Sequence, residues 1–292
     1  MKTLAIMIKT FMRSDCLTKC IQSIESHVKD IPYRIYIADD GNIDSGKSEL
    51  YDTLEKKGHF ILKLPFDIGA SAGRNALIPH IQEKYLLRLD DDFLFTTETH
   101  IDKMIYILDH VDNIGAISDL ERQLTDGKGI NAGSIQSSGQ GFLRFYVGTL
   151  IKEYIDLSQI KYDYINSIRY CKCEFARNFL LIRRSMLEEI KWDEELKIQG
   201  EHVDFMMQIK NHPYWQLAFT PDSIHSHAGP PDADLPLNYL NMRNRKNEMW
   251  PILFRKWGIF NIASANGSLS KRAKLGFFVY APLLYMKKIL FF

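Results

Sequence analysis

A repeated order of apolar run, polar turn and helix-like segment constrains the fold of this chain more than any other feature. Residues 3–8 are apolar, Ser14 is expected to cap a helix, and aliphatic residues then recur at helical spacing over residues 17–28. The stretch YRIYIADDG begins the next unit, residues 47–57 are compatible with a helix, and HFILKLPF is a further apolar run. Successive β-α-β units predict a parallel sheet with helices on its faces.

The third unit ends in a cluster of acidic residues. GASAGRNALIPHI reads as a loop entering a helix, and KYLLRLDDDFLFT reads as a buried strand that runs into three aspartates. Ligands of open α/β sheets bind beyond the carboxyl ends of the strands, so polar side chains at these ends are expected to line one crevice. They are Thr10, Arg13, Asp39, Asp40, Asp90, Asp91 and Asp92.

The second half of the chain has a less regular pattern. Residues 121–170 gain Gly, Ser and Tyr, which predicts hairpins or a flexible insertion, before a helix near Gly200 and a strand at WQLAFT. We therefore expect a catalytic domain followed by an extension. The expected boundaries are 1–235 for the catalytic domain, with halves 1–119 and 120–235, and 236–292 for a basic, aromatic and helical C-terminal extension.

Charge and cysteine usage exclude some classes of protein. With 37 basic and 36 acidic residues, nothing in the overall charge suggests a nucleic-acid partner. The four cysteines form C-x3-C and C-x-C pairs, which are neither zinc-knuckle nor thioredoxin spacings, so reduced thiols in a cytoplasmic protein are expected. The first apolar run is about half of a signal-peptide core and is interrupted by Lys9, which favours a strand.

The three aspartates at 90–92 are the strongest chemical signal. Crowded carboxylates at the end of a buried strand repel one another unless a cation or a proton compensates them. Carboxylate oxygens suit Mg2+ or Mn2+, which are often shared between a few carboxylates and the phosphates of a substrate. The alternative is a solvated acidic loop without a metal.

The ordered motifs resemble those of a known family. RLDDD, preceded by ADDG and followed by GEHVDF, is similar to family 2 glycosyltransferases over roughly residues 3–230. The segment NFLLIRRSMLEEIKWDEELKIQGEHVDF is similar to bacterial and animal members related to β-1,4-N-acetylgalactosaminyltransferases. The resemblance implies an α/β, GT-A (Rossmann-like) fold with a mostly parallel sheet flanked by helices, and a C-terminal helical amphipathic appendage.

The resemblance also implies which residues hold the donor. The polar residues after the first two strands would bind the nucleoside, expected to be uridine, and the loop GASAGRN would face its base or phosphates. Small residues in that loop are equally consistent with tight packing of a helix on the sheet. The donor-binding residues implied are Thr10, Arg13, Asp39, Asp40, Arg74, Asn75, Asp90 and Asp91.

For metal and catalysis the resemblance implies a second set. Asp92 would bind the metal together with His227, which lies six residues after a proline in TPDSIHSHAG, with His225 as the reserve ligand. The resemblance implies Glu201 as the catalytic base or, next, His202, which replaces the second acidic residue usual in such a motif. Asp204 is a further candidate base. The alternative is that these carboxylates have no catalytic role: Glu201 would lie at a helix start, where the helix dipole favours a negative charge, and Asp204 would face solvent.

The implied reaction is inverting, non-processive transfer from a UDP-sugar, with Mn2+ or Mg2+, to a glycan or lipid-linked glycan. The sugar is expected to be an N-acetylhexosamine or a hexose, in bacterial polysaccharide biosynthesis. Processive synthases usually carry a Gln-x-x-Arg-Trp motif and spanning helices, and neither is found here. Two other functions stay open: a non-catalytic glycan-binding or scaffold protein on the same fold, and a metal-dependent phosphatase, for which the threonine after DDDFLF falls two residues late.

The C-terminal sequence suggests a membrane surface. Residues 270–292 combine lysines and arginine with apolar residues, but Pro282 and Lys287–Lys288 leave the run shorter than the ~20 residues of a spanning helix. We expect peripheral attachment to the inner face of the cytoplasmic membrane. The alternative is packing on the catalytic domain or on another subunit of a homo-oligomer.

A second basic cluster, at Arg243, Arg245 and Lys246, would close over the diphosphate or form a solvated loop.

Overall fold

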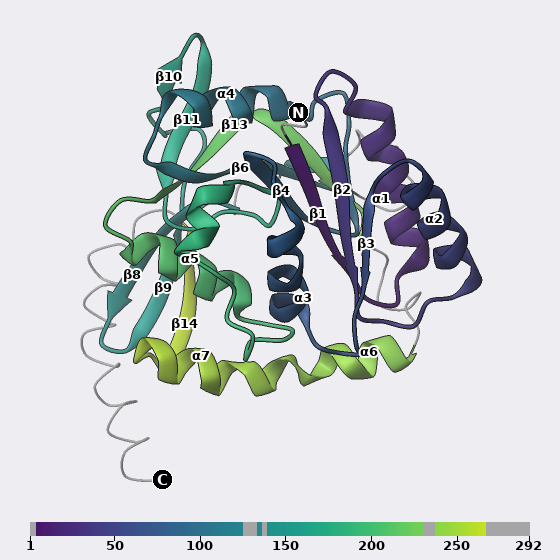
Figure 1. Cartoon of the computed structure of the whole chain (residues 1–292). Helices are drawn as coiled ribbons and strands as arrows, with labels where there is room; N and C mark the ends of the chain where they lie inside the picture. The colour runs from purple at the N-terminus through teal and green to yellow at the C-terminus, as the bar shows by residue number, and fades with distance from the viewer. Residues whose placement is uncertain (1–3, 125–132, 136–138, 230–236, 267–292) are drawn as a thin grey trace, which may run out of the picture.

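The computed structural model describes residues 4–124, 133–135, 139–229 and 237–266. Figure 1 shows one large twisted sheet with helices on both faces and a smaller sheet beside it. The strands are β1 (Leu4–Thr10), β2 (Tyr33–Asp39), β3 (Phe60–Lys63), β4 (Tyr85–Asp90), β5 (Phe93–Leu94), β6 (Ile114–Leu124), β7 (Gly133–Ile135), β8 (Gly141–Tyr146), β9 (Thr149–Tyr154), β10 (Asp163–Ile165), β11 (Ile168–Cys173), β12 (Leu180–Arg183), β13 (Gln216–His227) and β14 (Asn261–Asn266). The helices are α1 (Ser14–His27), α2 (Ser45–Lys56), α3 (Ala70–Leu77), η1 (Ile78–His80), α4 (Ile101–His110), η2 (Arg184–Glu188), α5 (Glu201–Asn211), α6 (Leu237–Asn244), η4 (Arg245–Met249) and α7 (Trp250–Trp257).

The first half of the chain forms the predicted parallel sheet. β1 pairs in parallel with β2 and β4, and β2 pairs in parallel with β3. The register sets Thr10 beside Asp39 and Lys9 beside Asp90, so the carboxyl ends of three strands lie level. Because β1 and β4 are buried on both faces, their apolar runs are continuous rather than alternating.

The start of the first helix differs from the prediction. Arg13 occupies the N-cap position of α1 and no side chain caps this end, whereas Ser14 is the first helical residue. The hydroxyl of Ser14 donates instead to the side chain of Asp44, which caps α2. The Ser14 hydroxyl is thus used as a donor to a residue that is distant in sequence and does not cap α1.

Beyond β4 the sheet becomes mixed. The order is β10-β11-β13-β6-β12-β4-β1-β2-β3, with β5 paired to β13 and β7 to β6. β12 runs antiparallel between β4 and β6, with Leu180 opposite both Arg88 and Ser118. The apolar run before the arginine pair thus fills the centre of the sheet and ties the two halves of the chain together.

Residues 121–170 contain hairpins, as predicted. β8 and β9 form one, and β10 and β11 form another. The turn of the first hairpin holds Val147 and Gly148 at positive φ, and that of the second holds Asn166 and Ser167 there. The β8–β9 hairpin leaves the main sheet and pairs through β9 with β14.

The described part of the C-terminal extension, residues 237–266, is not helical throughout. It contains α6, η4 and α7, and then β14, which pairs in parallel with β9 from Thr149 to Tyr154. In Figure 1 the helices α6 and α7 run along the edge of the molecule where β1, β2 and β3 end. The extension is therefore part of the wall around the carboxyl ends of the strands.

The proposed membrane element at residues 270–292 lies outside the described residues. Among the helices that are described, none combines the length and the apolarity needed to cross a bilayer.

Candidate active site

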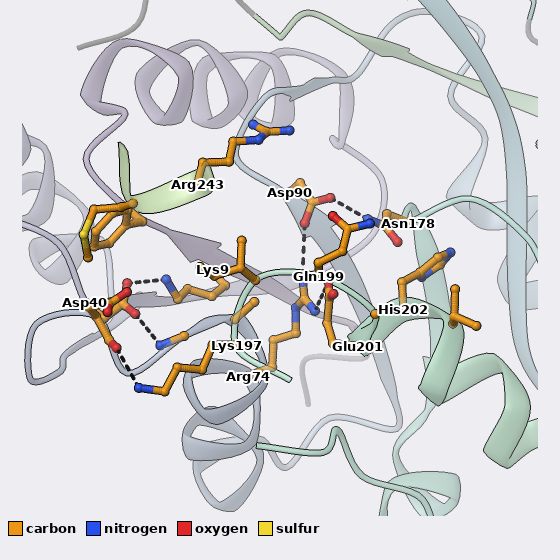
Figure 2. A pocket seen from close by; sticks show the side chains of 18 of the residues that line it. Lys9, Asp40, Arg74, Asp90, Asn178, Lys197, Gln199, Glu201, His202 and Arg243 are labelled. Atoms are coloured by element: carbon orange, nitrogen blue, oxygen red, sulfur yellow. Dashed lines mark hydrogen bonds and ion pairs between the residues drawn. The ribbon is translucent and has the colours of Figure 1, made fainter. Parts of the chain in front are cut away.

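A cavity of about 400 Å3 opens at the carboxyl ends of β1, β2 and β4. The start of α5 and the helix α6 form its other walls, and Figure 2 shows the acidic and basic side chains that point into it. A second cavity of about 290 Å3 adjoins it. The two share five lining residues, so we treat them as one cleft. The shared residues are Arg13, Asp90, Asn178, His202 and Arg243.

The three consecutive aspartates do not face the same way. Asp90 and Asp92 line the cleft, whereas Asp91 is fully buried. Its carboxylate accepts from the Thr10 hydroxyl at 2.7 Å and from the guanidinium of Arg13. The alternation of an extended chain separates the outer two aspartates from the middle one, so Asp91 anchors the loop beneath the cleft.

Asp90 is held as a carboxylate by fixed partners. Asn178 Nδ2 donates to it at 2.8 Å, and guanidinium nitrogens of Arg74 and Arg88 lie 3.3 Å from its other oxygen. Burial alone would raise the pKa of Asp90, but the two arginines and the amide outweigh this and lower it. The group therefore presents a negative charge to the cleft at neutral pH.

Thr10 and Arg13 meet the aspartates from the end of β1. The Thr10 side chain is buried against Asp91 and does not reach the cleft. Arg13 lines both cavities, donates to Asp92 Oδ2 at 2.7 Å, and lies with its guanidinium carbon 5.7 Å from the centre of the Tyr239 ring. Of the two, only Arg13 can contact a ligand in the cleft as it stands.

The two aspartates at the end of β2 also face different ways, one into the protein and one into the cleft. Asp39 is buried and accepts from Gly41 N–H at 2.9 Å, Lys47 Nζ at 2.9 Å and the Tyr51 hydroxyl at 2.6 Å. Asp40 lines the cleft, where it accepts from Lys9 and, at 2.8 Å, from Gly69 N–H. Asp39 therefore holds α2 on the sheet, and Asp40 is the residue of the pair that faces the cleft.

The neighbours Arg74 and Asn75 also point in different directions. Arg74 bridges the cleft, with one terminal nitrogen 3.3 Å from Asp90 and the other 3.3 Å from Glu201. Asn75 instead exchanges hydrogen bonds with the backbone of Trp192, at 2.8 and 3.2 Å, and does not line the cleft. The expected donor-binding role of Asn75 is thus replaced by anchoring of the segment before α5.

Asp92 and His227 face each other across the second cavity, with Nε2 of the histidine 3.5 Å from Oδ2 of the aspartate. Burial would lower the pKa of His227, but Asp92 and Glu121 raise it to about 10. Within the described residues, no three His, Cys, Asp or Glu side chains converge as a complete metal cage. The pair can supply two ligands, which suits a hard ion that takes the rest from phosphates and water.

His225 lies behind this pair. Its side chain is fully buried, its ring stacks on Phe179 with centroids 4.6 Å apart, and Nδ1 is 2.7 Å from Asp119. Burial opposes the charge of this imidazole, yet Asp119 and Glu121 raise its pKa to about 8. His225 is not on the cleft surface, so the structure favours His227 over the reserve ligand.

The candidate bases Glu201 and His202 begin α5 and both line the cleft. His202 Nε2 is 2.7 Å from the carbonyl oxygen of Ala176, which can only accept, so Nε2 carries the proton and Nδ1 is free to accept one. Burial, with the charges of Arg88 and Lys152, lowers the pKa of His202 to about 3, so the imidazole is neutral at physiological pH.

Asp204 neither binds in the cleft nor faces solvent. It is fully buried, and Trp257 Nε1, Gln208 Nε2 and Lys256 Nζ lie 2.9, 2.7 and 2.9 Å from its oxygens. This carboxylate therefore fixes α7 to α5. The geometry leaves Glu201 and His202 as the candidate bases.

Comparison with known families fits this arrangement. The model of the family described as "Glycosyl transferase family 2" matches residues 5–190. The chain belongs to this family. The prediction of the family is confirmed, and with it the phosphatase alternative loses its support.

Curated relatives of this family 2 member include animal enzymes. The chain is 27% identical over 202 residues to "Beta-1,4 N-acetylgalactosaminyltransferase 1" of Rattus norvegicus, which covers 68% of the chain and 34% of the relative. It is 36% identical over 104 residues to the protein of the same name from Mus musculus, covering 36% of the chain and 18% of the relative. The chain thus spans at most about a third of the length of these relatives.

Solved structures share the fold. The crystal structure of S. aureus TarS 1-349 in complex with UDP has a TM-score of 0.53 and 14% identity, with coverage of 88% of this chain and 74% of TarS. The mannosyltransferase PcManGT from Pyrobaculum calidifontis, in complex with GDP-Man and Mn2+, has a TM-score of 0.53 and 11% identity, with coverage of 79% and 58%. The predicted GT-A fold is confirmed.

Several residues of the family 2 cleft were not predicted from sequence. Lys9 pairs with Asp40, Asn178 donates to Asp90, and Tyr239 lies over Arg13. Lys9 was visible only as a charge inside an apolar strand, and Asn178 as a polar residue inside an apolar run. Of the second basic cluster, Arg243 lines the cleft, whereas Arg245 is 2.7 Å from Asp67.

Proposed function

We propose that this protein is a metal-dependent, inverting and non-processive glycosyltransferase that transfers an N-acetylhexosamine or a hexose from a UDP-sugar to a glycan or lipid-linked glycan. One observation carries the proposal: Asp90, Asp92, His227 and Glu201 meet in a single cleft at the carboxyl ends of the parallel strands. The names of the curated relatives support an N-acetylhexosamine donor, and the UDP complex of TarS supports uridine.

The nucleoside would lie between the ends of β1 and β2. Asp40 is fixed there by Lys9 and by Gly69 N–H, and its carboxylate can accept from a base N–H or a ribose hydroxyl. Gly69 has a φ of +99°, and a Cβ at this position would come within 2.8 Å of Lys197 Cα. Only glycine therefore brings this N–H to Asp40.

A divalent ion, Mn2+ or Mg2+, would be held by Asp92 and His227, with Asp90 close by. Bound there, it would offset the negative charge of the departing nucleoside diphosphate. The residues present suit this ion, because a carboxylate and an imidazole leave coordination positions for phosphate oxygens, and binding of the ion would displace the proton that the raised pKa keeps on His227. Arg13 and Arg243 line the same cavity and add fixed positive charge toward the diphosphate.

Glu201 would remove the proton of the acceptor hydroxyl. Arg74 lies between Glu201 and Asp90 and holds both carboxylates in the cleft. Nδ1 of the neutral His202 is the alternative acceptor of this proton. Attack by the hydroxyl on the face of the sugar opposite to the diphosphate would invert the anomeric carbon.

The cellular site follows from the same proposal. A cytoplasmic enzyme, peripheral on the inner face of the cytoplasmic membrane through residues 270–292, would reach a lipid-linked acceptor. Association through that segment with another subunit is the alternative.

Isothermal titration of UDP and a panel of UDP-sugars, with and without Mn2+, tests the donor site. UDP should bind in a Mn2+-dependent manner, and Asp92→Ala should abolish the metal dependence, whereas the exposed Asp112→Ala should behave as the wild type. Binding of UDP without any donor hydrolysis or transfer would favour a scaffold protein. Absence of binding to every nucleotide would refute the donor site itself.

A further inference from the structure

A small recess of about 120 Å3 opens off the acceptor side of the cleft. It lies between the β8–β9 hairpin, the segment before β12, and the first turn of α5. Lys152 and His202 line both the recess and the cleft, so the two spaces are continuous. The recess contains two cationic side chains, Lys152 and Arg177, and none of its lining residues is acidic.

Lys152 faces the recess because of its position on β9. Side chains alternate along a strand, so Lys152 and Tyr154 share one face and Glu153 occupies the other. Glu153 is 3.1 Å from Arg144 on β8 and is thereby used outside the recess. Lys152 makes no ion pair with any residue that the structure describes, and burial, with the charge of Arg177, lowers its pKa.

Arg177 is only partly compensated. One terminal nitrogen lies 3.4 Å from Glu121, but this carboxylate also lies beside His225 and His227. Nε of Arg177 is buried and has no hydrogen-bond acceptor among the described residues. A Cβ on Gly139 would come within 2.6 Å of this Nε, so the guanidinium group lies directly against the backbone of Gly139.

We infer that this recess binds an anionic group of the acceptor, a carboxylate or a phosphate, so that the enzyme modifies an acidic glycan. The inference rests on the proposed function. A partly buried ammonium group without an ionic partner among the described residues and an unsatisfied guanidinium N–H would both be satisfied by one bound anion. Since His202 stands between cleft and recess, the anionic group belongs on the saccharide that carries the attacking hydroxyl or on its neighbour.

The donor diphosphate is a less suitable anion for this lysine. Lys152 does not line the second cavity, where Asp92 and His227 lie. It lies instead on β9, in the small sheet formed by β14, β9 and β8. Arg177, by contrast, lines both the recess and the second cavity, so the recess adjoins the site of the proposed metal and diphosphate and is distinguished from it by Lys152.

Transfer to matched acceptors tests the inference. Each of a set of β-hexosides is offered in three forms: neutral, as its 6-phosphate and as its 6-uronate. The wild type should use one acidic form with a kcat/KM about 10- to 100-fold above the neutral form, the strength of a charged hydrogen bond. Lys152→Gln and Arg177→Gln should lose this preference, and Lys152→Arg should retain it. Whichever acidic form is preferred identifies phosphate or carboxylate as the ligand.

Controls separate this site from the donor site. Lys172→Gln, at an exposed lysine on β11, should leave the preference unchanged. Affinity for UDP should be the same in Lys152→Gln as in the wild type, and its loss would place the lysine in the donor site and overturn the inference. Equal use of neutral and acidic acceptors by the wild type would also overturn it.

A crystal soaked with selenate and UDP decides the matter if no hexoside in the set is used. Selenate bound to Lys152 and Arg177, and lost in Lys152→Gln, supports an anion site, whereas no selenate there refutes it. Failure of UDP to bind would instead refute the proposed function, and the selenate result can be read without it.

Discussion

The two walls of the cleft, one at the ends of β1, β2 and β4 and the other at the recess, differ in how their charged side chains are paired. At the ends of β1, β2 and β4 every buried aspartate has a cation or donor from the chain itself: Lys47 for Asp39, Lys9 for Asp40, and Arg13 for Asp91. On the opposite wall, formed by the β8–β9 hairpin and the segment before β12, Lys152 has no ionic partner among the described residues and Arg177 is only partly paired. The side chains of the first wall are fixed by partners within the chain, whereas those of the second are the ones that we propose an anionic ligand would pair.

The largest expected effect is on the stability of the wall at the ends of β1, β2 and β4. Asp39→Asn leaves Lys47 buried without a counter-charge, so the free energy of unfolding should fall by about 3–5 kcal/mol. Urea denaturation measures this. The double variant Asp39→Asn with Lys47→Met removes the uncompensated charge and should recover much of the loss. A single variant as stable as the wild type would show that this wall is not held by the ion pair.

Substitutions of the neighbours Arg74 and Asn75 should have different effects, the first on kcat and the second on stability. Arg74→Gln frees Glu201 and removes one of the three side-chain partners of Asp90, so kcat should fall about 100-fold, with UDP affinity less affected. Asn75→Ala removes hydrogen bonds to Trp192 and should cost about 1–3 kcal/mol of stability, with kcat of the folded enzyme unchanged. Steady-state kinetics and urea denaturation on both variants provide the comparison. A comparable fall of kcat in Asn75→Ala would place this residue in the active site.

The smallest effect concerns His202, which stays neutral between the two walls. Burial, Arg88 and Lys152 lower its pKa to about 3 in the folded protein, while in the unfolded chain it titrates near its usual value of about 6.5. Between these values the unfolded chain binds the extra proton, so this residue makes stability fall as the pH drops from about 6.5 toward 3.

The Tm of His202→Asn should accordingly fall less steeply than that of the wild type between pH 6.5 and 4.5, by a few degrees. Thermal denaturation across this range measures the difference. His80→Asn, at an exposed histidine, is the matched control and should follow the wild type. Identical slopes for His202→Asn and the wild type would mean that His202 is not kept neutral by its surroundings.

Sequence patterns predicted the parallel core and the crevice, because these depend on local apolar runs and on the position of polar residues at strand ends. They could not tell Asp91 from Asp90 and Asp92, since that difference depends on Thr10 and Arg13, which are about eighty residues away in sequence. Asn75 was assigned to the donor for the same reason, because its partner Trp192 is brought to it only by folding. Asp204 could be removed from the candidate bases only from the structure, in which Trp257 on α7 donates a hydrogen bond to its carboxylate.

The pairing of β14 with β9 has a consequence for biosynthesis. During translation the β8–β9 hairpin emerges from the ribosome long before residues 261–266. One edge of β9 therefore stays unpaired until β14, more than a hundred residues later in the sequence, has been made. Tyr239 and Arg243, which complete the cleft, also emerge late. The lining of the cleft is therefore incomplete in a nascent chain until residues 237–250 have been translated.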